Sequence, residues 1–174
     1  MRLFIAINLN NATKNSLIDL RDELKASSER GSFTLRENLH ITLAFLGECD
    51  FKQTARLKSV MDTVSFAPFA LHVERVGRFG GGGGNSESTW WAGVNVAGAL
   101  SDLFYNLSDK LDEAGFIVDK RKFSPHITLG RRVVTDMAPR RVEPFGETVK
   151  KIDLMKSERI DGKLTYTSIH QRTS

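Results

Sequence analysis

The sequence contains one tetrapeptide twice, as His40-Ile41-Thr42-Leu43 and as His126-Ile127-Thr128-Leu129. Side chains alternate between the two faces of a β-strand. In each copy the His and the Thr therefore share one face, while the Ile and the Leu can anchor the opposite face in a hydrophobic core. Each copy predicts a strand that presents an imidazole and a hydroxyl to the same side.

Each tetrapeptide closes a longer repeated unit. The stretch 4–9 (Phe-Ile-Ala-Ile-Asn-Leu) corresponds to the stretch 91–96 (Trp-Ala-Gly-Val-Asn-Val), and an amphipathic helix pattern follows each one. The first stretch begins 36 positions before His40, and the second begins 35 positions before His126. This strand–helix–strand repeat predicts an α+β fold in which two lobes face each other about a pseudo-twofold axis.

Hydrophobic periodicity and cap signals predict the other elements. We expect strands over residues 2–9, 38–46, 69–78, 88–96, 123–131, 148–155 and 164–171. We expect helices over residues 11–26, after an Asp50 cap, and along an apolar stripe formed by Leu100, Leu103, Phe104, Leu107 and Leu111. Gly115 is placed to end that last helix. A single domain over residues 1–174 is expected, with repeat units at about 2–46 and 88–131.

Gly80 to Gly84 form a run of five consecutive glycines. A phosphate-binding loop of the P-loop type requires a Lys and a Ser or Thr after its glycines, and the sequence lacks them here. We therefore expect this run to be a flexible hairpin tip or a lid beside the site.

The repeated His and Thr suit phosphoryl transfer that needs no metal. Two facing strands would line a cleft with two imidazoles and two hydroxyls. One histidine can take a proton from water, and the other can protonate the leaving sugar oxygen, because imidazole titrates near neutral pH. The hydroxyls of Thr42 and Thr128 can hydrogen-bond the non-bridging phosphate oxygens. A five-membered cyclic phosphate is already strained, which eases the reaction.

The histidines of the two tetrapeptides also have a structural explanation. A single His on an apolar strand is usually a structural residue. Duplication of a core strand, however, would preserve Ile and Leu and gives no reason to keep both His and Thr. A zinc site is disfavoured because the sequence has no His-Glu-x-x-His string and no cysteine pair. His72 and His170 lack a Thr two positions later, and we assign both to structure or surface.

The charge distribution modestly favours a polyanionic partner. The formal net charge is +4 at pH 7. Cations gather around the second tetrapeptide, at Lys120, Arg121, Lys122, Arg131 and Arg132. This cluster fits either a phosphate-binding surface or a solvated loop.

Arg131 is either a candidate phosphate ligand or a solvated residue at the end of the strand. Regular alternation would point its side chain away from His126, but Gly130 permits a bulge that could turn it toward the site. A guanidinium there would bind a phosphate bidentately. Trp90, Trp91 and Phe123 are candidates for base stacking, although core packing explains them at least as well.

The cysteine content and the N-terminal apolar run indicate where the protein is located. Cys49 is the only cysteine, so no internal disulfide can form and a reducing compartment, the cytoplasm, is expected. The apolar run at residues 3–7 is too short for a signal peptide or a membrane span.

At these residues the sequence resembles the two-histidine phosphoesterase superfamily. It is particularly similar to the RNA 2′,3′-cyclic phosphodiesterases historically called 2′-5′ RNA ligases. The similar stretches are Arg2 to Ala6, Leu39 to Leu43 with Phe45 to Gly47, Phe123 to Arg131, and Leu154 to Ser157. The resemblance implies a bilobal α+β fold, with antiparallel sheets and outer helices around a central cleft.

The resemblance also implies an activity and residue roles. The expected reaction hydrolyses an RNA 2′,3′-cyclic phosphate to a 2′-phosphate without metal or other cofactor, and the same site could run a reversible 2′-5′ RNA ligation. His40 is similar to the family's proton donor, and His126 to its proton acceptor. Thr42, Thr128 and Arg131 match phosphate-binding positions.

The implied partner is an RNA that ends in a 2′,3′-cyclic phosphate, such as a tRNA fragment, and the protein is expected to act as a monomer away from membranes. Two alternatives stay open at this point. The site could act on small cyclic nucleotides or 2′-5′ oligonucleotides, or the chain could be a non-catalytic RNA-binding module.

Overall fold

The computed structural model describes residues 1–80, 86–95, 98–120 and 123–174. Within these residues the elements follow one another in the order β1 (Arg2–Asn8), α1 (Asn11–Ala26), β2 (Ser28–Phe33), the 3-10 helix η1 (Arg36–Asn38), β3 (His40–Glu48), α2 (Phe51–Asp62), β4 (Phe69–Gly80), β5 (Ser88–Val94), α3 (Ala99–Glu113), β6 (His126–Thr135), β7 (Arg140–Val149), β8 (Lys151–Ile160) and β9 (Lys163–Thr173). Residues 81–84 of the glycine run, predicted as a hairpin tip or lid, lie outside the described residues.

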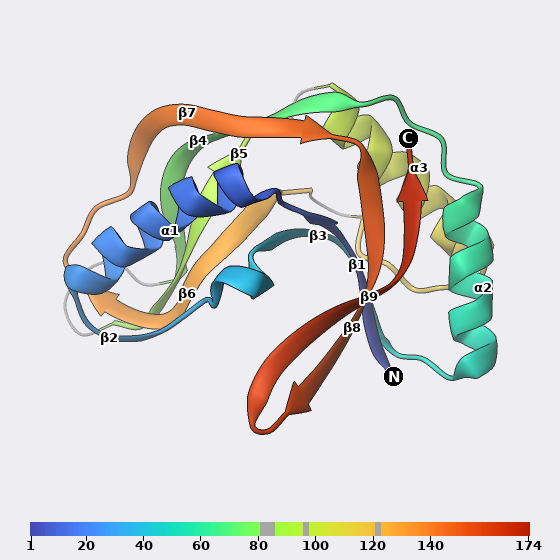
Figure 1. Ribbon diagram of the computed structural model, residues 1–174, viewed down its shortest axis with the longest axis horizontal. Coiled ribbons are helices and arrows are strands. Elements are labelled where there is room, and N and C mark those ends of the chain that lie inside the picture. Colours follow the sequence, from blue (N-terminus) through green and yellow to red (C-terminus); the bar gives the residue numbers. More distant parts are fainter. Residues whose placement is uncertain (81–85, 96–97, 121–122) are drawn as a thin grey trace.

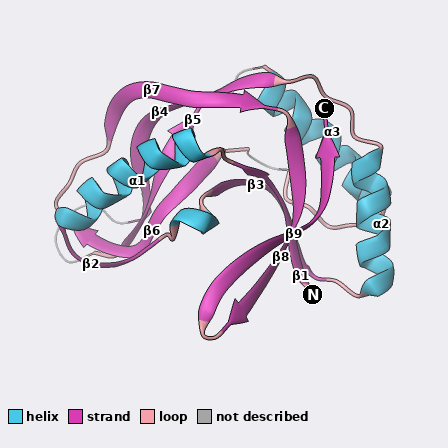
Figure 2. Ribbon diagram, viewed as in Figure 1, coloured by secondary structure: helices cyan, strands magenta, loops and turns pink. Residues whose placement is uncertain are grey.

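The strands form two antiparallel sheets, which build the two lobes (Figure 1). One sheet has the order β3-β1-β8-β9, and the other has the order β2-β6-β5-β4-β7. Helix α1 packs on β6 and β7 of the second sheet, whereas α2 packs on β9 of the first sheet and on α3 (Figure 2). The predicted bilobal α+β fold is confirmed.

The helices begin and end at the residues that their local chemistry favours. Asn10 caps α1 through its side chain, which accepts a hydrogen bond from the Thr13 backbone N–H at 2.8 Å. Asp50 and Gln53 form a reciprocal capping box at the start of α2. After α3, Gly115 has a φ of 87°, a conformation that favours glycine, and this ends the helix as predicted.

Each repeated unit builds an antiparallel strand pair. In β1 and β3, Asn8 lies opposite His40, and in β5 and β6, Gly93 lies opposite His126, so the register of the two pairs differs by two residues of the repeat. Ile and Leu of both tetrapeptides are buried in one hydrophobic cluster that joins the two sheets. The His and Thr residues stay partly exposed on the other face, as strand alternation predicts.

Two strands were not predicted, and both are edge strands of the five-stranded sheet. Strand β2 is polar and lacks an alternating pattern, so only its pairing with β6 makes it a strand. Strand β7 contains Pro144 and Gly146, which edge positions tolerate because one side of the backbone needs no partner. A Cβ at position 146 would lie 1.7 Å from the Leu71 backbone oxygen, which explains the glycine.

Several element boundaries also differ from the predictions. Strand β6 begins at His126 and not at residue 123, and the strand predicted over residues 148–155 spans the end of β7 and the start of β8. Asn38 ends η1, so β3 begins at His40 and not at residue 38. Strands β8 and β9 extend into a tight hairpin, because Asp161 and Gly162 have φ values of 50° and 77°, the combination that a type I′ turn requires.

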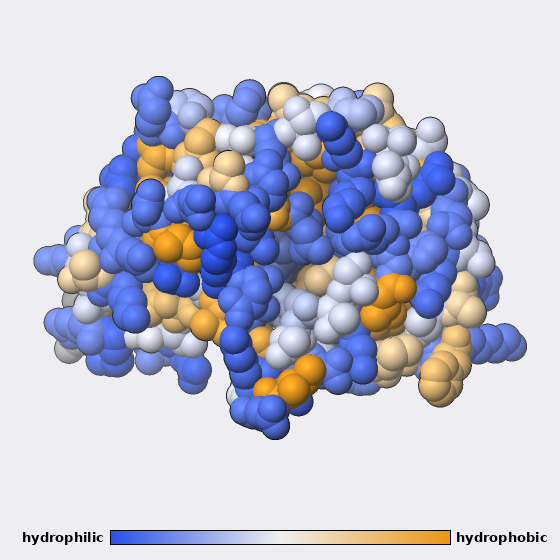
Figure 3. All heavy atoms as spheres, viewed as in Figure 1, coloured by the Kyte–Doolittle hydropathy of each residue, from blue (hydrophilic) through white to orange (hydrophobic). Residues whose placement is uncertain are grey.

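The face shown in Figure 3 is mostly hydrophilic, and its hydrophobic residues form small separate groups. None of the helices in the described parts of the chain combines the length and the apolar character that a membrane crossing requires.

Candidate active site

A cavity of about 320 Å³ lies where the two lobes meet. It is lined by Ser32, Phe33, Thr34, Leu35, Asn38, His40, Thr42, Phe45, His126, Thr128, Arg131, Arg159, Leu164 and Tyr166. The structure therefore brings all five site residues predicted from the sequence to one cavity. His40 and Thr42 come from β3 of the first sheet, and His126, Thr128 and Arg131 come from β6 of the second.

The two imidazoles are oriented in the same way. Nδ1 of His40 lies 2.7 Å from the carbonyl oxygen of Asn38, and Nδ1 of His126 lies 2.8 Å from that of Ser124. A carbonyl accepts only, so Nδ1 carries the proton in each ring and Nε2 is the nitrogen that can gain or lose one. In both cases the carbonyl belongs to the residue two positions before the histidine.

The Nε2 atoms differ in their surroundings. Nε2 of His40 lies 2.9 Å from Oγ1 of Thr42, so in the neutral ring the hydroxyl donates to it. Nε2 of His126 has no hydrogen-bond partner among the described residues. The cavity thus offers one imidazole whose reactive nitrogen is engaged by a hydroxyl and one that is open to a ligand.

Aromatic rings hold each imidazole from the side. The His40 ring lies 5.0 Å from the Phe4 ring and 5.3 Å from the Tyr166 ring, which meets it edge-on. The His126 ring lies 6.4 Å from the Trp91 ring and 5.1 Å from the ring of Phe79 on β4, which meets it edge-on. Phe4 and Trp91 begin the two matched stretches of the sequence repeat, so the repeat supplies each histidine with an equivalent aromatic neighbour.

Arg131 reaches the cavity because β6 is irregular. Gly130 lies opposite Trp90, and Thr128 lies opposite Trp91, so one extra residue is inserted in β6 between them. A further irregularity follows at Arg132, whose φ is 52°. These bulges replace the regular alternation that would point Arg131 away from the histidines.

His40 is electrostatically coupled to the rest of the cavity. Burial lowers the pKa of His40 below its ordinary value of 6.5, because the charged ring loses water, and the positive charges of Arg131, His126 and Lys14 lower it further. The hydrogen bond to the Asn38 carbonyl acts in the opposite direction. The free protein therefore favours neutral His40.

Titration of the imidazoles by NMR should show this coupling. We expect His40 to titrate below pH 6.5, and we expect Arg131→Gln to raise its pKa because a positive charge near the ring is removed. The pKa of His40 is lower in the folded protein than in the unfolded chain, so the unfolded chain takes up the proton at a higher pH. His40 therefore lowers the free energy of unfolding as pH falls below 6.5. An unchanged His40 titration in the Arg131→Gln variant would contradict the assigned coupling.

Other sequence-based candidates lie elsewhere. The His72 side chain is exposed on β4, and Nε2 of His170 donates to Oδ1 of Asp62 at 2.7 Å on the α2 side. Trp90 is buried, and Phe123 stacks on Phe104 with ring centroids 3.9 Å apart, so both have packing roles.

The basic cluster contributes one described residue to the cavity, Arg131. Lys120 is paired with Asp109 at 3.0 Å and with Asp112 at 3.2 Å. Arg121 and Lys122 lie outside the described residues.

Several cavity residues were not found from the sequence. Phe45 is 62% exposed although it is a large apolar side chain, and Arg159, Leu164 and Tyr166 come from the β8–β9 hairpin. Asn38 is buried and ties η1 to β9, because its Nδ2 donates to the Leu164 carbonyl at 3.0 Å. The Asp161-Gly162 turn was the signal that could have placed the hairpin residues.

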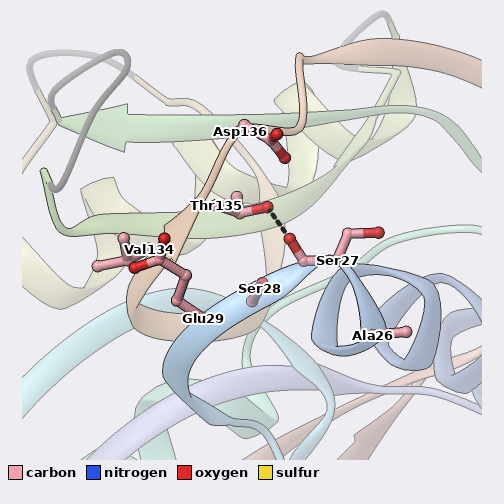
Figure 4. Close-up of a pocket in the computed structure, with 7 residues that line it drawn as sticks. All are labelled: Ala26, Ser27, Ser28, Glu29, Val134, Thr135 and Asp136. Carbon is pink, nitrogen blue, oxygen red and sulfur yellow. Dashed lines mark hydrogen bonds between the residues drawn. The ribbon is translucent and has the colours of Figure 1, made fainter.

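A second hollow, of about 490 Å³, lies between the α1–β2 connection and the end of β6 (Figure 4). Oγ1 of Thr135 donates to the Ser27 carbonyl at 2.6 Å across it. Glu29 and Asp136 give it two carboxylates, which repel a phosphate, so the histidine-lined cavity is the candidate site for a phosphate ester. Among the described residues, no three His, Cys, Asp or Glu side chains converge as a metal site would need.

Known proteins are similar to this chain in sequence and in fold. The family model described as LigT like Phosphoesterase matches residues 7–90 and 94–166. An RNA 2′,3′-cyclic phosphodiesterase of Archaeoglobus fulgidus is 37% identical over 131 residues, which are 75% of this chain and 72% of that protein. One of Methanocaldococcus jannaschii is 30% identical over 90% of this chain and 91% of its own length. The crystal structure of apo LigT from Escherichia coli superposes with a TM-score of 0.82 at 24% identity, covering 99% of this chain and 96% of that one.

Proposed function

Because this chain belongs to the LigT-like phosphoesterase family, we propose that it hydrolyses RNA 2′,3′-cyclic phosphates to 2′-phosphates. The observation that carries the proposal is the pair of imidazoles, oriented alike by backbone carbonyls, on one cavity with two hydroxyls and a guanidinium. That set of groups supplies an acid, a base and anion-binding donors.

The proposed reaction opens the ring at its 3′ side. Nε2 of His126 takes a proton from a water molecule, whose oxygen attacks phosphorus. The bond between phosphorus and O3′ breaks, and His40 gives its Nε2 proton to O3′, so that the phosphate remains on O2′. A 5′ hydroxyl in place of water would form a 2′-5′ linkage through the same steps.

Binding of the substrate prepares His40 for its role. The proton donor must be charged, yet burial lowers the pKa of His40 in the free protein. A cyclic phosphate carries a negative charge, which raises the pKa of a nearby imidazole and so favours the protonated ring. Thr42, Thr128 and Arg131 hold the non-bridging oxygens, where negative charge is concentrated.

We further propose that residues 1–174 act as one monomeric domain in the cytoplasm. One hydrophobic cluster contains residues of both sheets, which supports a single folding unit.

The lone Cys49 is buried, and burial raises the pKa of its thiol, which supports a structural cysteine rather than a nucleophile.

Incubation of the purified protein with an RNA that ends in a 2′,3′-cyclic phosphate, in the presence of EDTA, tests the function. We expect ring opening with a 2′-phosphate as the product, identified by ³¹P NMR against both authentic isomers. The His40→Asn/His126→Asn double variant, purified in the same way, controls for contaminating nucleases. A 3′-phosphate product, or an intact ring, would refute the proposal.

A further inference from the structure

We propose that Arg159 binds the phosphodiester on the 5′ side of the terminal nucleotide, so that the cavity selects a cyclic phosphate carried by an RNA chain over a free cyclic mononucleotide. The inference rests on the proposed function and adds a second phosphate site to it. A 2′,3′-cyclic mononucleotide with a 5′ hydroxyl has no phosphate to place there, whereas every RNA end has one.

Arg159 lines the cavity from beyond the end of the neighbouring strand. Strand β1 pairs with β8 only as far as Arg2, which lies opposite Ser157. Arg159 is two residues farther along β8, about 7 Å at the usual rise of a strand, on the hairpin that projects past the sheet (Figure 1). Arg159 therefore lines the cavity from the projecting hairpin and not from the two strands that carry the histidines.

Among the residues that the structure describes, no carboxylate forms an ion pair with the guanidinium of Arg159. Its hydrogen-bond partner among the described residues is the Gly162 carbonyl, at 3.0 Å. The two lysines nearest the hairpin turn are each paired with a carboxylate, because Lys156 lies 3.0 Å from Glu158 and Lys163 lies 2.6 Å from Glu37. A guanidinium has five N–H donors, so Arg159 retains several for an anion in the cavity.

Arg131 and Arg159 reach the cavity from different sheets. Arg131 lies on β6, the strand that carries His126, and its charge lowers the pKa of both His40 and Tyr166. Arg159 lines the same cavity from β8 of the other sheet. Two separate guanidiniums on one cavity suit two phosphates one nucleotide apart.

The apolar part of the cavity lining suits a nucleoside. Leu164 lies opposite Arg159 in the β8–β9 pairing, and the exposed ring of Phe45 lines the same cavity. An aromatic face can stack a base without regard to its identity. The cavity therefore combines apolar surface for the terminal nucleoside with a cation for the phosphate on its 5′ side.

The test compares Arg159→Gln with the wild type on two substrates that share one terminal nucleoside. One is the 2′,3′-cyclic mononucleotide with a 5′ hydroxyl, and the other is a trinucleotide with the same cyclic end. We expect the trinucleotide's kcat/KM to fall about 10- to 100-fold, the range for a lost charge-assisted hydrogen bond. The ratio of trinucleotide to mononucleotide kcat/KM should fall by about tenfold or more. The salt dependence for the trinucleotide should lose about 0.7 of its logarithmic slope, as for one phosphate contact to a single strand.

Arg56→Gln is the matched control, because Arg56 is an exposed arginine on α2, outside the cavity. Equal losses on both substrates, or an unchanged trinucleotide rate, would overturn the inference. Binding of the cyclic-ended trinucleotide to the His40→Asn/His126→Asn variant, with and without Arg159→Gln, tests the second phosphate site even if the wild type proves inactive. Unaltered affinity there would overturn the inference as well.

Discussion

Replacing His40 or His126 with alanine is expected to lower kcat for a cyclic-ended RNA by roughly two to four orders of magnitude, the usual contribution of a positioned acid or base. The reason is geometric, since each ring presents Nε2 while Nδ1 is held by a backbone carbonyl, at 2.7 Å in His40 and 2.8 Å in His126. Single-turnover kinetics would measure the loss in the chemical step. The double variant should lose little more than the worse single variant, because an acid and a base act as a unit.

The asparagine variants separate chemistry from folding. An Asn side chain can still donate a hydrogen bond to the Asn38 or Ser124 carbonyl, but it cannot exchange a proton near neutral pH. His40→Asn and His126→Asn should therefore stay folded and lose activity as the alanine variants do. His72→Ala, at an exposed histidine on β4, should keep wild-type activity. A folded His40→Asn or His126→Asn variant with wild-type kcat would exclude the assigned roles.

Arg131→Gln is expected to lower kcat by roughly 100- to 1,000-fold, as for the loss of one donor to a developing oxyanion. Arg131 lines the cavity, and its charge already acts on His40 and Tyr166 in the free protein. The loss should appear mainly in kcat, because negative charge on the non-bridging oxygens is best matched by the guanidinium in the transition state. Arg131→Lys should recover part of the rate, since it restores the charge without the planar fork.

The neighbouring arginine provides the matched control for this substitution. Arg132 is exposed, follows Arg131 directly and does not line the cavity. Arg132→Gln changes the net charge by the same amount, so a general electrostatic effect on RNA binding would lower the activity of both variants equally. Only a larger loss in Arg131→Gln supports a contact with the reacting phosphate.

The shared face of the two histidines could be predicted because its signal is local and repeated. Strand alternation needs only the positions of Ile41, Leu43, Ile127 and Leu129 to place the histidines on the opposite face, and those four residues are buried in the structure. The start of the helix after Asn10 and the end of the helix before Gly115 could also be predicted from the sequence, because helix caps act over three or four residues.

Other parts of the fold and the site depend on distant residues. Strand β2 is polar and becomes a strand only through its pairing with β6, and β7 tolerates Pro144 because it lies at a sheet edge. Phe45 and Tyr166 have no local mark of a site residue; they line the cavity because their strands run beside β1 and β8.

The amino-acid sequence by itself determined the α+β class, the repeat and the two histidines with their threonines. Those features follow from side-chain periodicity along single strands. Only the tertiary structure decided that Arg131 enters the cavity, because the bulges of β6 form against Trp90 and Trp91 of the adjacent strand. It also decided that Arg159 lies on the same cavity, because β8 continues past the end of its pairing with β1. Register and bulges arise from pairing between strands far apart in the chain, and no local pattern encodes them.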